Sequence, residues 1–256
     1  MGKSRAKSEP QPSDSRPLIV FPGGGIYFWW QAGVVQGLQK RINVDSFDFT
    51  GASAGSLSAV FAACGVDMMQ AFHLAQKLAE EKNVWTRKEG LAGIWGDMIY
   101  QWLDELLPEN AAEICTDRVD MVAVSVTSVR LSFLPLKRKS ITRFKTKKDL
   151  IEACMASVHV PMFLDGKMSR SLDGDICVDG SITFVLRNKP WHFKPQDRKP
   201  SLMIHHQDDK ELMARKWNFL ETISLDQFEE MFEMGQKYAE EMIDKKTLES
   251  FIQEYS

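Results

Sequence analysis

The sequence predicts an α/β fold built around a mainly parallel sheet. The first observation is a short apolar run, Leu18–Phe21, which leads through a glycine loop into a helical pattern over Ile26–Arg41. The second is another short apolar run, Phe47–Thr50, which leads through a tight turn into a helical pattern over Ser56–Cys64. Two strands joined in this order by a helix are expected to lie side by side and parallel, with a right-handed crossover between them.

Farther along the chain, hydrophobic periodicity predicts further elements of the same fold. Alternating runs rich in β-branched residues indicate strands, and apolar residues spaced three and four apart indicate helices. A strand, a hairpin, a helix, a last strand and a long helix are predicted over Met121–Val129, Arg130–Phe144, Lys147–Ser157, Ser201–His205 and Leu225–Tyr255, respectively.

We expect one domain preceded by a tail. The 256 residues are enough for a single α/β domain with a substantial core. Residues 1–17 are rich in Ser, Pro, Lys and Arg and have no apolar periodicity, so a disordered basic tail is predicted there. The domain is expected to span residues 18–256, with a helical C-terminal part over 217–256.

Composition and charge narrow the class of protein. Apolar residues make up 44% of the chain and the formal net charge is -3, which is typical of a globular protein and gives no global reason to expect nucleic acid as a partner. No apolar run resembles a signal peptide or approaches the roughly 20 residues of a membrane span. We therefore expect an intracellular protein, either cytoplasmic or peripheral at a membrane or lipid surface. The cysteines form no CxxC pair and indicate buried free thiols in a reducing compartment: Cys64, Cys115, Cys154 and Cys177.

Residues 51–55, Gly-Ala-Ser-Ala-Gly, match the G-x-S-x-G nucleophile elbow. A strand is predicted before them and a helix after them, which is the context that the elbow requires. Small residues at Gly51 and Gly55 allow helix and strand to approach closely around Ser53. The free N–H groups of the following helix favour negative charge near the serine hydroxyl. The alternative is a helix start rich in small residues that carries no chemistry.

Gly23, Gly24 and Gly25 follow the first predicted strand and precede a helix. Backbone N–H groups in such a loop can point at a bound anion, because no side chain stands in the way. The anion could be a phosphate, although the loop lacks both the P-loop ending and the spaced glycines of a dinucleotide fingerprint. It could also be the oxyanion of an acyl intermediate, since the adjacent parallel strands would place this loop beside Ser53. A plain tight turn is the third interpretation.

A serine nucleophile needs a base, and one scheme uses a histidine. A downstream histidine would complete a Ser-Asp-His triad, and His192, His205 and His206 are available. Against this scheme, folds with that triad usually place more chain between the glycine loop and the elbow than one crossover helix.

The second scheme uses an aspartate that accepts the proton directly. Three Asp-Gly pairs lie close together, at Asp165, Asp173 and Asp179. An ordinary aspartate is a weak base at neutral pH, so the carboxylate would have to be desolvated. Asp179 has the most apolar neighbours of the three, whereas Asp173 and Asp175 are predicted to form a solvated turn.

Four blocks of the sequence, taken in order, resemble the patatin-like phospholipase family: Phe21-Pro-Gly-Gly-Gly-Ile, Gln31-Ala-Gly-Val-Val, Gly51-Ala-Ser-Ala-Gly and Val178-Asp-Gly-Ser. The segments Val124-Ser-Val-Thr and Met155-Ala-Ser-Val-His-Val-Pro also resemble that family. The similarity covers about Leu18 to Phe184, so the motif-bearing part of the domain is placed at 18–184.

The resemblance implies a three-layer α/β/α fold with a mainly parallel central sheet and a lipid acyl hydrolase activity. It implies a catalytic dyad of Ser53 as nucleophile and Asp179 as general base, with Gly180 in the dyad loop and no histidine. The backbone of Gly23–Gly25 is implied as the oxyanion hole. No cofactor is implied, and the five histidines show no metal-ligand spacing.

The sequence departs from the family pattern in two places. Tyr27 and Phe28 stand where many members have Arg or Lys followed by Gly, and Ser181 stands where Gly or Ala is usual. These departures leave lipid binding without turnover as an alternative to lipid ester hydrolysis. Transacylation to an alcohol or lysolipid and phosphate binding also remain open.

Three weaker signals concern lipid contact, and each has a structural alternative. The aromatic run Ile26–Trp30 could line an acyl-chain pocket or simply pack on the sheet. The apolar face that begins at Trp95 and ends at Leu106 could lie on a lipid surface or cover the core. The basic run between Lys137 and Lys148 could touch anionic headgroups or form a solvated hairpin.

Overall fold

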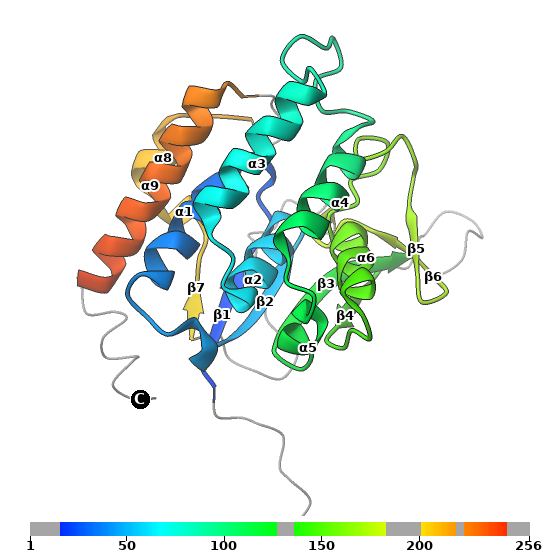
Figure 1. Cartoon of the computed structure of the whole chain (residues 1–256), viewed down its shortest axis with the longest axis horizontal. Coiled ribbons are helices and arrows are strands. Elements are labelled where there is room, and N and C mark those ends of the chain that lie inside the picture. Colours follow the sequence, from blue (N-terminus) through cyan, green and yellow to red (C-terminus); the bar gives the residue numbers. More distant parts are fainter. Residues whose placement is uncertain (1–15, 127–135, 183–200, 219–222, 245–256) are drawn as a thin grey trace, which may run out of the picture.

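Parallel strands form the centre of the sheet, and antiparallel strands extend it on one side (Figure 1). The computed structural model describes residues 16–126, 136–182, 201–218 and 223–244. Within these residues the strands are β1 (Leu18–Phe21), β2 (Asp48–Ala52), β3 (Val119–Val126), β4 (Leu136–Ile141), β5 (Arg170–Leu172), β6 (Asp175–Val178) and β7 (Leu202–Met203). Their order is β5-β6-β3-β2-β1-β7, and β4 also pairs with β3.

The first two strands are adjacent and parallel, as the sequence predicts. Leu18 of β1 lies opposite Asp48 of β2, and Phe21 lies opposite Gly51. β7 and β3 are parallel to their neighbours β1 and β2, whereas β4 and β6 are antiparallel to β3 and β5 is antiparallel to β6. The predicted α/β fold with a central sheet that is parallel at its centre is confirmed.

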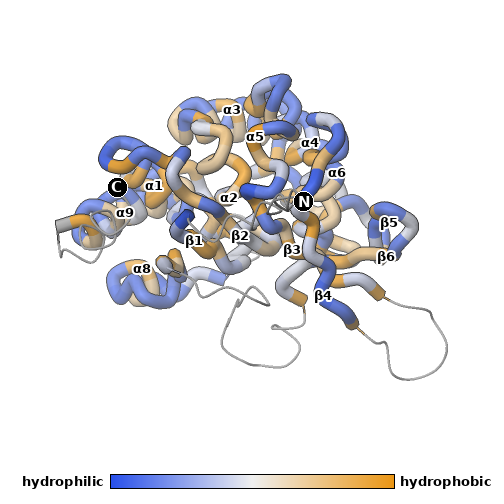
Figure 2. The backbone as a smooth tube through the Cα atoms, turned by 90° about the horizontal axis from the view of Figure 1, so that it is seen from below, coloured by the Kyte–Doolittle hydropathy of each residue, from blue (hydrophilic) through white to orange (hydrophobic). Residues whose placement is uncertain are grey.

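Helices flank this sheet. Those that the structure describes are α1 (Phe28–Gln39), α2 (Ala54–Cys64), α3 (Met68–Glu81), α4 (Trp95–Leu106), α5 (Ala111–Cys115), α6 (Lys147–Ser157), α8 (Lys210–Ala214) and α9 (Leu225–Asp244), with short 3-10 turns η1 (Gly25–Tyr27), η2 (Val44–Ser46) and η3 (His206–Asp208). Figure 2 shows α2 to α6 together on one side of the sheet and α8 on the other. None of these described helices has the length and apolarity needed to cross a bilayer.

Local sequence signals set the ends of several helices. Asp67 caps α3 by accepting the N–H groups of the next turn, at 2.8 Å and 3.3 Å. Thr146 and Asp149 form a reciprocal capping box at the start of α6, with both bonds at 3.1 Å. Gly65 ends α2 in the left-handed conformation, with φ +63°, which glycine adopts without steric cost.

Helix α9 is joined to the sheet-bearing part by a close contact with α1. A Cβ atom on Gly33 of α1 would lie 2.0 Å from the carbonyl oxygen of Phe232, and one on Gly235 of α9 would lie 2.0 Å from that of Trp30. The two backbones therefore touch, which only glycine permits. The described part of the predicted C-terminal helix thus packs on the same core as the strands.

Most predicted elements are found, with shifted boundaries. The predicted turn over residues 51–55 is narrower, because Gly51 and Ala52 extend β2 and α2 begins at Ala54. The predicted strand over Ser201–His205 is shortened to β7, and α3 and α5 were not predicted. The tail predicted over residues 1–17 lies outside the described residues except for its last two. Residues 127–129 of the predicted strand, residues 130–135 of the predicted hairpin and the end of the predicted long helix also lie outside them.

The predicted turn near Asp173 connects β5 to β6. Asp173 and Gly174 have φ of +51° and +80°, the pair of positive values that a two-residue hairpin turn requires. Asp175 is the first residue of β6 rather than part of the turn. The four cysteines are free thiols, as predicted, although Cys64 is only half-buried.

Candidate active site

Two strands end head to head on the same edge of β3. β2 runs parallel to β3 and ends with Ala52 opposite Val122. β6 runs antiparallel to β3 and ends with Val178 opposite Val124. Because β4 occupies the other edge of β3 over the same stretch, β2 and β6 must share the remaining edge. The last residues of β2 and β6 therefore pair with β3 residues that are only two positions apart.

The residues that follow these strand ends are Ser53 and Asp179. Both line one cavity, where burial raises the pKa of the Asp179 carboxyl and the Ser53 hydroxyl offsets part of that rise. The sheet pairing thus brings together the two residues that the sequence singled out, although they are far apart along the chain.

Ser53 has a strained backbone at the junction of β2 and α2. Its φ of +53° and ψ of -132° lie outside the regions that residues with a side chain normally adopt. The strain is imposed by close packing on both sides: a Cβ on Gly51 would lie 2.1 Å from the carbonyl oxygen of Gly55, and one on Gly55 would lie 1.9 Å from that of Phe21. The geometry presents the serine side chain at the N-terminus of α2.

The end of α6 and the residues just after it bind the segments that contain Ser53 and Asp179. The hydroxyl of Ser157 accepts the N–H of Ser53 at 3.0 Å and donates to the carbonyl of Val122 at 2.6 Å. The N–H of Asp179 donates to the carbonyl of His159 at 2.8 Å, and the N–H of Gly180 donates to the carbonyl of Ser157 at 2.9 Å. This role of Ser157 was not predicted; the signal for it in the sequence is a polar residue within the block that resembles the family.

Asp179 is buried, and its burial is the main cause of the shift in its pKa. Desolvation raises the pKa of this carboxyl to about 6, while the Ser53 hydroxyl and the Ser181 N–H offset part of the rise. Oδ1 accepts the N–H of Ser181 at 2.7 Å. Oδ2 has no hydrogen-bond partner among the described residues and is buried. The carboxylate therefore keeps one oxygen available beside the Ser53 hydroxyl.

The glycine loop lies directly against the elbow. The position of a Cβ on Gly23 is 3.0 Å from Cβ of Ser53, and both Gly24 and Gly25 line the same cavity as Ser53. Gln31, fully buried in α1, donates to the carbonyl of Pro22 at 2.7 Å and accepts the hydroxyl of Ser58 at 2.8 Å. Gln31 thereby ties the start of the loop to α2, a role that a polar residue on a buried helix face could have signalled.

The cavity that contains Ser53 has a volume of about 500 Å³ and an apolar wall. Trp29 is at the centre of the aromatic part, with ring centroids 5.4 Å from Phe72, 5.9 Å from Trp102 and 5.4 Å from Phe228. Other described residues along the wall are Ile26, Phe28, Leu57, Ala75, Ala79, Leu91, Trp95, Met98, Ile99, Val158, Val160, Pro161 and Leu225. The two aromatic stretches that the sequence left open, after the glycine loop and in α4, both contribute to this wall.

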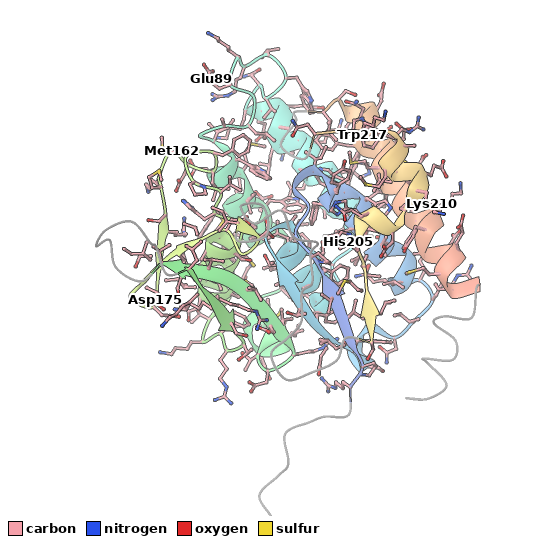
Figure 3. The ribbon with its side chains drawn as sticks, turned by 180° about the vertical axis from the view of Figure 1, so that it is seen from behind. Glu89, Met162, Asp175, His205, Lys210 and Trp217 are labelled. Carbon is pink, nitrogen blue, oxygen red and sulfur yellow. The ribbon has the colours of Figure 1, made fainter. Side chains whose placement is uncertain are left out.

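The surface near the cavity includes exposed apolar side chains. Met162 follows the lining residue Pro161, is 59% exposed, and has a φ of +66°. Trp85 lines the cavity and is also 38% exposed. Figure 3 shows Met162 and Glu89 at the same end of the molecule, with Asp175 at the far edge of the sheet. An opening here would present apolar groups to solvent.

The described histidines do not line the cavity. Nδ1 of His205 accepts the N–H of Gln207 at 3.1 Å at the start of η3. His206 stacks on Tyr27, with ring centroids 4.4 Å apart, and packs behind Gly24. Burial, with a smaller contribution from His205, lowers the pKa of His206 to about 3, so the ring is neutral at physiological pH. His192, the third histidine considered for a triad, lies outside the described residues.

The predicted basic run is largely paired with carboxylates. Lys139 lies 2.7 Å from Asp175, and Arg138 lies 2.9 Å from Asp120. Arg143 and Lys147 also face carboxylate groups, each at 3.1 Å. Such partners reduce the positive electrostatic field that would attract an anionic surface. The contacts favour the solvated-hairpin interpretation of this run over headgroup binding.

Comparisons with known proteins agree with these motifs. A sequence model of the patatin-like phospholipase family matches residues 19–192. The chain is 27% identical over 174 residues to an omega-hydroxyceramide transacylase of Mus musculus, covering 66% of this chain and 28% of the relative. The corresponding protein of Homo sapiens is 26% identical, with coverage of 66% and 31%.

A third curated relative is the 1-acylglycerol-3-phosphate O-acyltransferase Pnpla3 of Mus musculus, 24% identical over 176 residues, covering 66% of this chain and 40% of the relative. The chain thus spans well under half the length of these relatives. Among solved structures, the crystal structure of VipD from Legionella pneumophila matches with a TM-score of 0.40 and 14% identity, covering 79% of this chain and 52% of that one.

Proposed function

Because the chain belongs to the patatin-like phospholipase family, we propose that it cleaves carboxylic esters of lipids with a dyad of Ser53 and Asp179. The observation that carries the proposal is the convergence of β2 and β6 on one edge of β3, which sets the serine and the carboxylate side by side in a single apolar cavity. The domain that performs the reaction is proposed to span residues 18–256, with the motif-bearing part at 18–184.

In the first half of the reaction, Oγ of Ser53 attacks the ester carbonyl carbon and its proton passes to Oδ2 of Asp179. The carbonyl electron pair moves to the oxygen, which becomes an oxyanion held by N–H groups of Gly23–Gly25 and by the N-terminus of α2. When the intermediate collapses, the bond between the carbonyl carbon and the alcohol oxygen breaks. Asp179 returns its proton to the departing alcohol, and the acyl group remains on Ser53.

In the second half, water attacks the acyl carbonyl and gives its proton to Asp179. Collapse of the second tetrahedral intermediate breaks the bond to Oγ of Ser53, which takes the proton back. The fatty acid leaves, and the dyad is restored. The same two groups and the same oxyanion site serve both halves.

The raised pKa of Asp179, about 6, suits this role. A carboxylate with that pKa is mostly ionised at neutral pH and is a stronger base than an ordinary aspartate. Burial is the cause of the shift, and the hydroxyl of Ser53 is proposed to give its proton to this carboxylate. His206 is proposed to have no part in proton transfer, since its ring is neutral and packs behind Gly24.

The wall of the cavity supports an acyl chain as the group that is bound there. Binding of an acyl chain to aliphatic and aromatic side chains is favoured by about 25 cal/mol for each Å² of apolar surface that is removed from water. Three of the polar side chains of the described wall are those of Ser53, Asp179 and Ser181, beside which the ester is proposed to lie; Gln76 of α3 is another polar residue of the wall. The exposed side chains of Trp85 and Met162 are proposed to contact the lipid surface from which the substrate enters.

Transacylation is the second candidate, and the names of the relatives favour it. Two are described as omega-hydroxyceramide transacylases and one as an acyltransferase. In that reaction an alcohol takes the place of water in the second half, while Ser53 and Asp179 keep their roles. Products formed with and without an added lysolipid or long-chain alcohol would separate the two activities: a new ester means transfer, and free acid alone means hydrolysis.

Labelling with a fluorophosphonate tests the proposal most directly. The reagent should modify the wild-type protein and not the variant Ser53→Ala, because the activated serine oxygen attacks the phosphorus atom and displaces fluoride. Ser56→Ala is not a neutral control, since its hydroxyl donates to the Ser53 carbonyl, so Ser171→Ala in exposed β5 serves instead. Equal labelling of wild type and Ser53→Ala would remove Ser53 from the mechanism. Vesicle binding without cleavage of any ester would favour a lipid-binding role.

A further inference from the structure

The hydroxyl of Ser181 is a buried polar group with no protein partner in the described part of the chain. Ser181 is 4% exposed and lines the same cavity as Ser53 and Asp179. A buried hydroxyl without a hydrogen bond destabilises the folded state, so such groups are usually paired. Because Ser181 lines the cavity, a ligand bound close to its side chain would supply the missing partner.

The position of this hydroxyl relates it to the glycine loop. The site that a Cβ on Gly23 would occupy lies 2.0 Å from Oγ of Ser181 and 3.0 Å from Cβ of Ser53. Both serine side chains therefore pack on the same face of Gly23. The hydroxyl therefore lies beside the glycine loop that is proposed to hold the oxyanion.

The contact between Ser181 and Asp179 does not use the hydroxyl. It is the backbone N–H of Ser181 that donates to Oδ1 of Asp179, at 2.7 Å. The side chain consequently has its proton available for another acceptor. Replacing the side chain should leave this backbone bond, and with it the pKa of Asp179, in place.

Resting on the proposed function, we propose that the Ser181 hydroxyl donates a hydrogen bond to the substrate carbonyl oxygen, as a side-chain member of the oxyanion site. No proton is transferred in this contact. As Oγ of Ser53 forms its bond to carbon, the carbonyl electron pair moves to the oxygen, and the hydrogen bond from Ser181 strengthens with the growing negative charge. The same contact recurs when water attacks the acyl-enzyme, because a second oxyanion forms at the same place.

Ser181→Ala tests the role, with Ser171→Ala as the matched control in exposed β5. With enzyme in excess over an ester of a chromogenic alcohol and a radiolabelled acid, alcohol release reports acylation and acid release reports deacylation. Ser181→Ala should slow both steps by about 10- to 100-fold, the usual effect of losing one hydrogen bond to a charged oxygen. The pH at which the rate is half-maximal should not move, since the bond to Asp179 is made by the backbone.

The melting temperature distinguishes a loss of the hydrogen bond from a loss of packing. Ser181→Ala removes an unpaired buried hydroxyl, so its melting temperature should equal or exceed that of wild type, and Ser181→Gly should lose activity to the same extent. A slower variant that is also less stable would point to a packing role and overturn the proposal.

Two kinetic outcomes would also overturn it. Unchanged rates for both steps would show that the hydroxyl does not contact the reacting oxygen, and loss of deacylation alone would assign Ser181 to the incoming water or alcohol. Failure of the proposed function looks different: wild type and Ser53→Ala would then label equally, and wild type would release no alcohol from any ester. In that case the role of Ser181 falls with it.

Discussion

The hydroxyl of Ser157 accepts the backbone N–H of Ser53 at 3.0 Å, so the last residue of α6 fixes the strained elbow between β2 and α2. The same hydroxyl donates to the carbonyl of Val122 at 2.6 Å. Val122 lies opposite Ala52, the last residue of β2, so this bond to β3 is made where the pairing of β2 with β3 ends. One buried side chain therefore satisfies two backbone groups that the strand ladder leaves unpaired.

Removing this hydroxyl should weaken both the fold and the elbow. Ser157→Ala leaves the Ser53 N–H and the Val122 carbonyl without that partner, and we expect a loss of about 2 kcal/mol in the free energy of unfolding. Urea denaturation measures the loss, and fluorophosphonate labelling of Ser53 should become several-fold slower. Ser171→Ala in exposed β5 should change stability by less than about 0.5 kcal/mol. Similar stabilities of the two variants would contradict the role given to Ser157.

The rate of ester cleavage should follow the ionisation of Asp179. Its pKa is about 6, so kcat/KM is expected to rise with pH and to reach half its maximum near pH 6, because only the carboxylate accepts a proton. Asp179→Asn should lower kcat/KM by a factor on the order of 10² or more at pH 8 and abolish the inflection. His206→Phe keeps an aromatic ring on Tyr27 and should keep the inflection. Loss of the inflection in that variant alone would assign the base to a histidine.

The same carboxyl should make stability depend on pH. Because burial raises the pKa of Asp179 from near 3.8 to about 6, the folded state binds more protons than the unfolded state between these values. Stability contributed by the protonated form is present below about pH 4 and is lost as pH rises through 6, at a total cost on the order of 2–3 kcal/mol.

The variant Asp179→Asn should therefore be more stable than wild type above pH 6, by that order, and equal to it near pH 4. Its side-chain carbonyl can still accept the Ser181 N–H. Thermal unfolding at a series of pH values gives the comparison, and Asp173→Asn, in the exposed β5-β6 turn, controls for loss of a surface charge. A stability difference that did not change with pH would argue against a desolvated carboxylate.

The small residues at the elbow are required for steric reasons. In Gly55→Ala the new Cβ would lie 1.9 Å from the carbonyl oxygen of Phe21, a backbone atom that cannot rotate away. We expect a loss of about 3 kcal/mol or more, or failure to fold. Gly166→Ala is the matched control, since its φ is +75° and nothing lies within 4 Å of the new atom. Its cost should be roughly 1–2 kcal/mol, from backbone strain alone.

Chain-length preference should depend on the wall of the cavity. Ala75 lines the wall from α3, and Ala75→Trp would fill part of the space beside Trp29 and Phe72. Each methylene that no longer fits should lower kcat/KM by about fourfold, the equivalent of roughly 0.8 kcal/mol, so long-chain esters lose most and acetate esters little. Lys77→Trp, on the exposed face of the same helix, should leave the series unchanged. A uniform loss across chain lengths would place the acyl chain elsewhere.

The amino-acid sequence by itself determined the local elements and the family. Strand, glycine loop, helix, strand, elbow and helix follow from periodicity and from small residues close together in the chain, and the matched family model agrees with the blocks that resemble it. Such signals are local, because each depends on residues within one or two turns of each other.

The tertiary structure decided how the local pieces meet. That β6 returns antiparallel on the edge of β3 left free by β2 depends on long-range strand pairing, which leaves no periodic trace in the sequence. The same holds for Ser157 and Ser181, whose hydroxyls differ only in what packs around them: one pairs with two backbone groups, and the other is buried with no partner among the described residues. The sequence gives the chemical type of each residue. Its burial and its hydrogen-bond partners depend on contacts between segments that are far apart in the sequence.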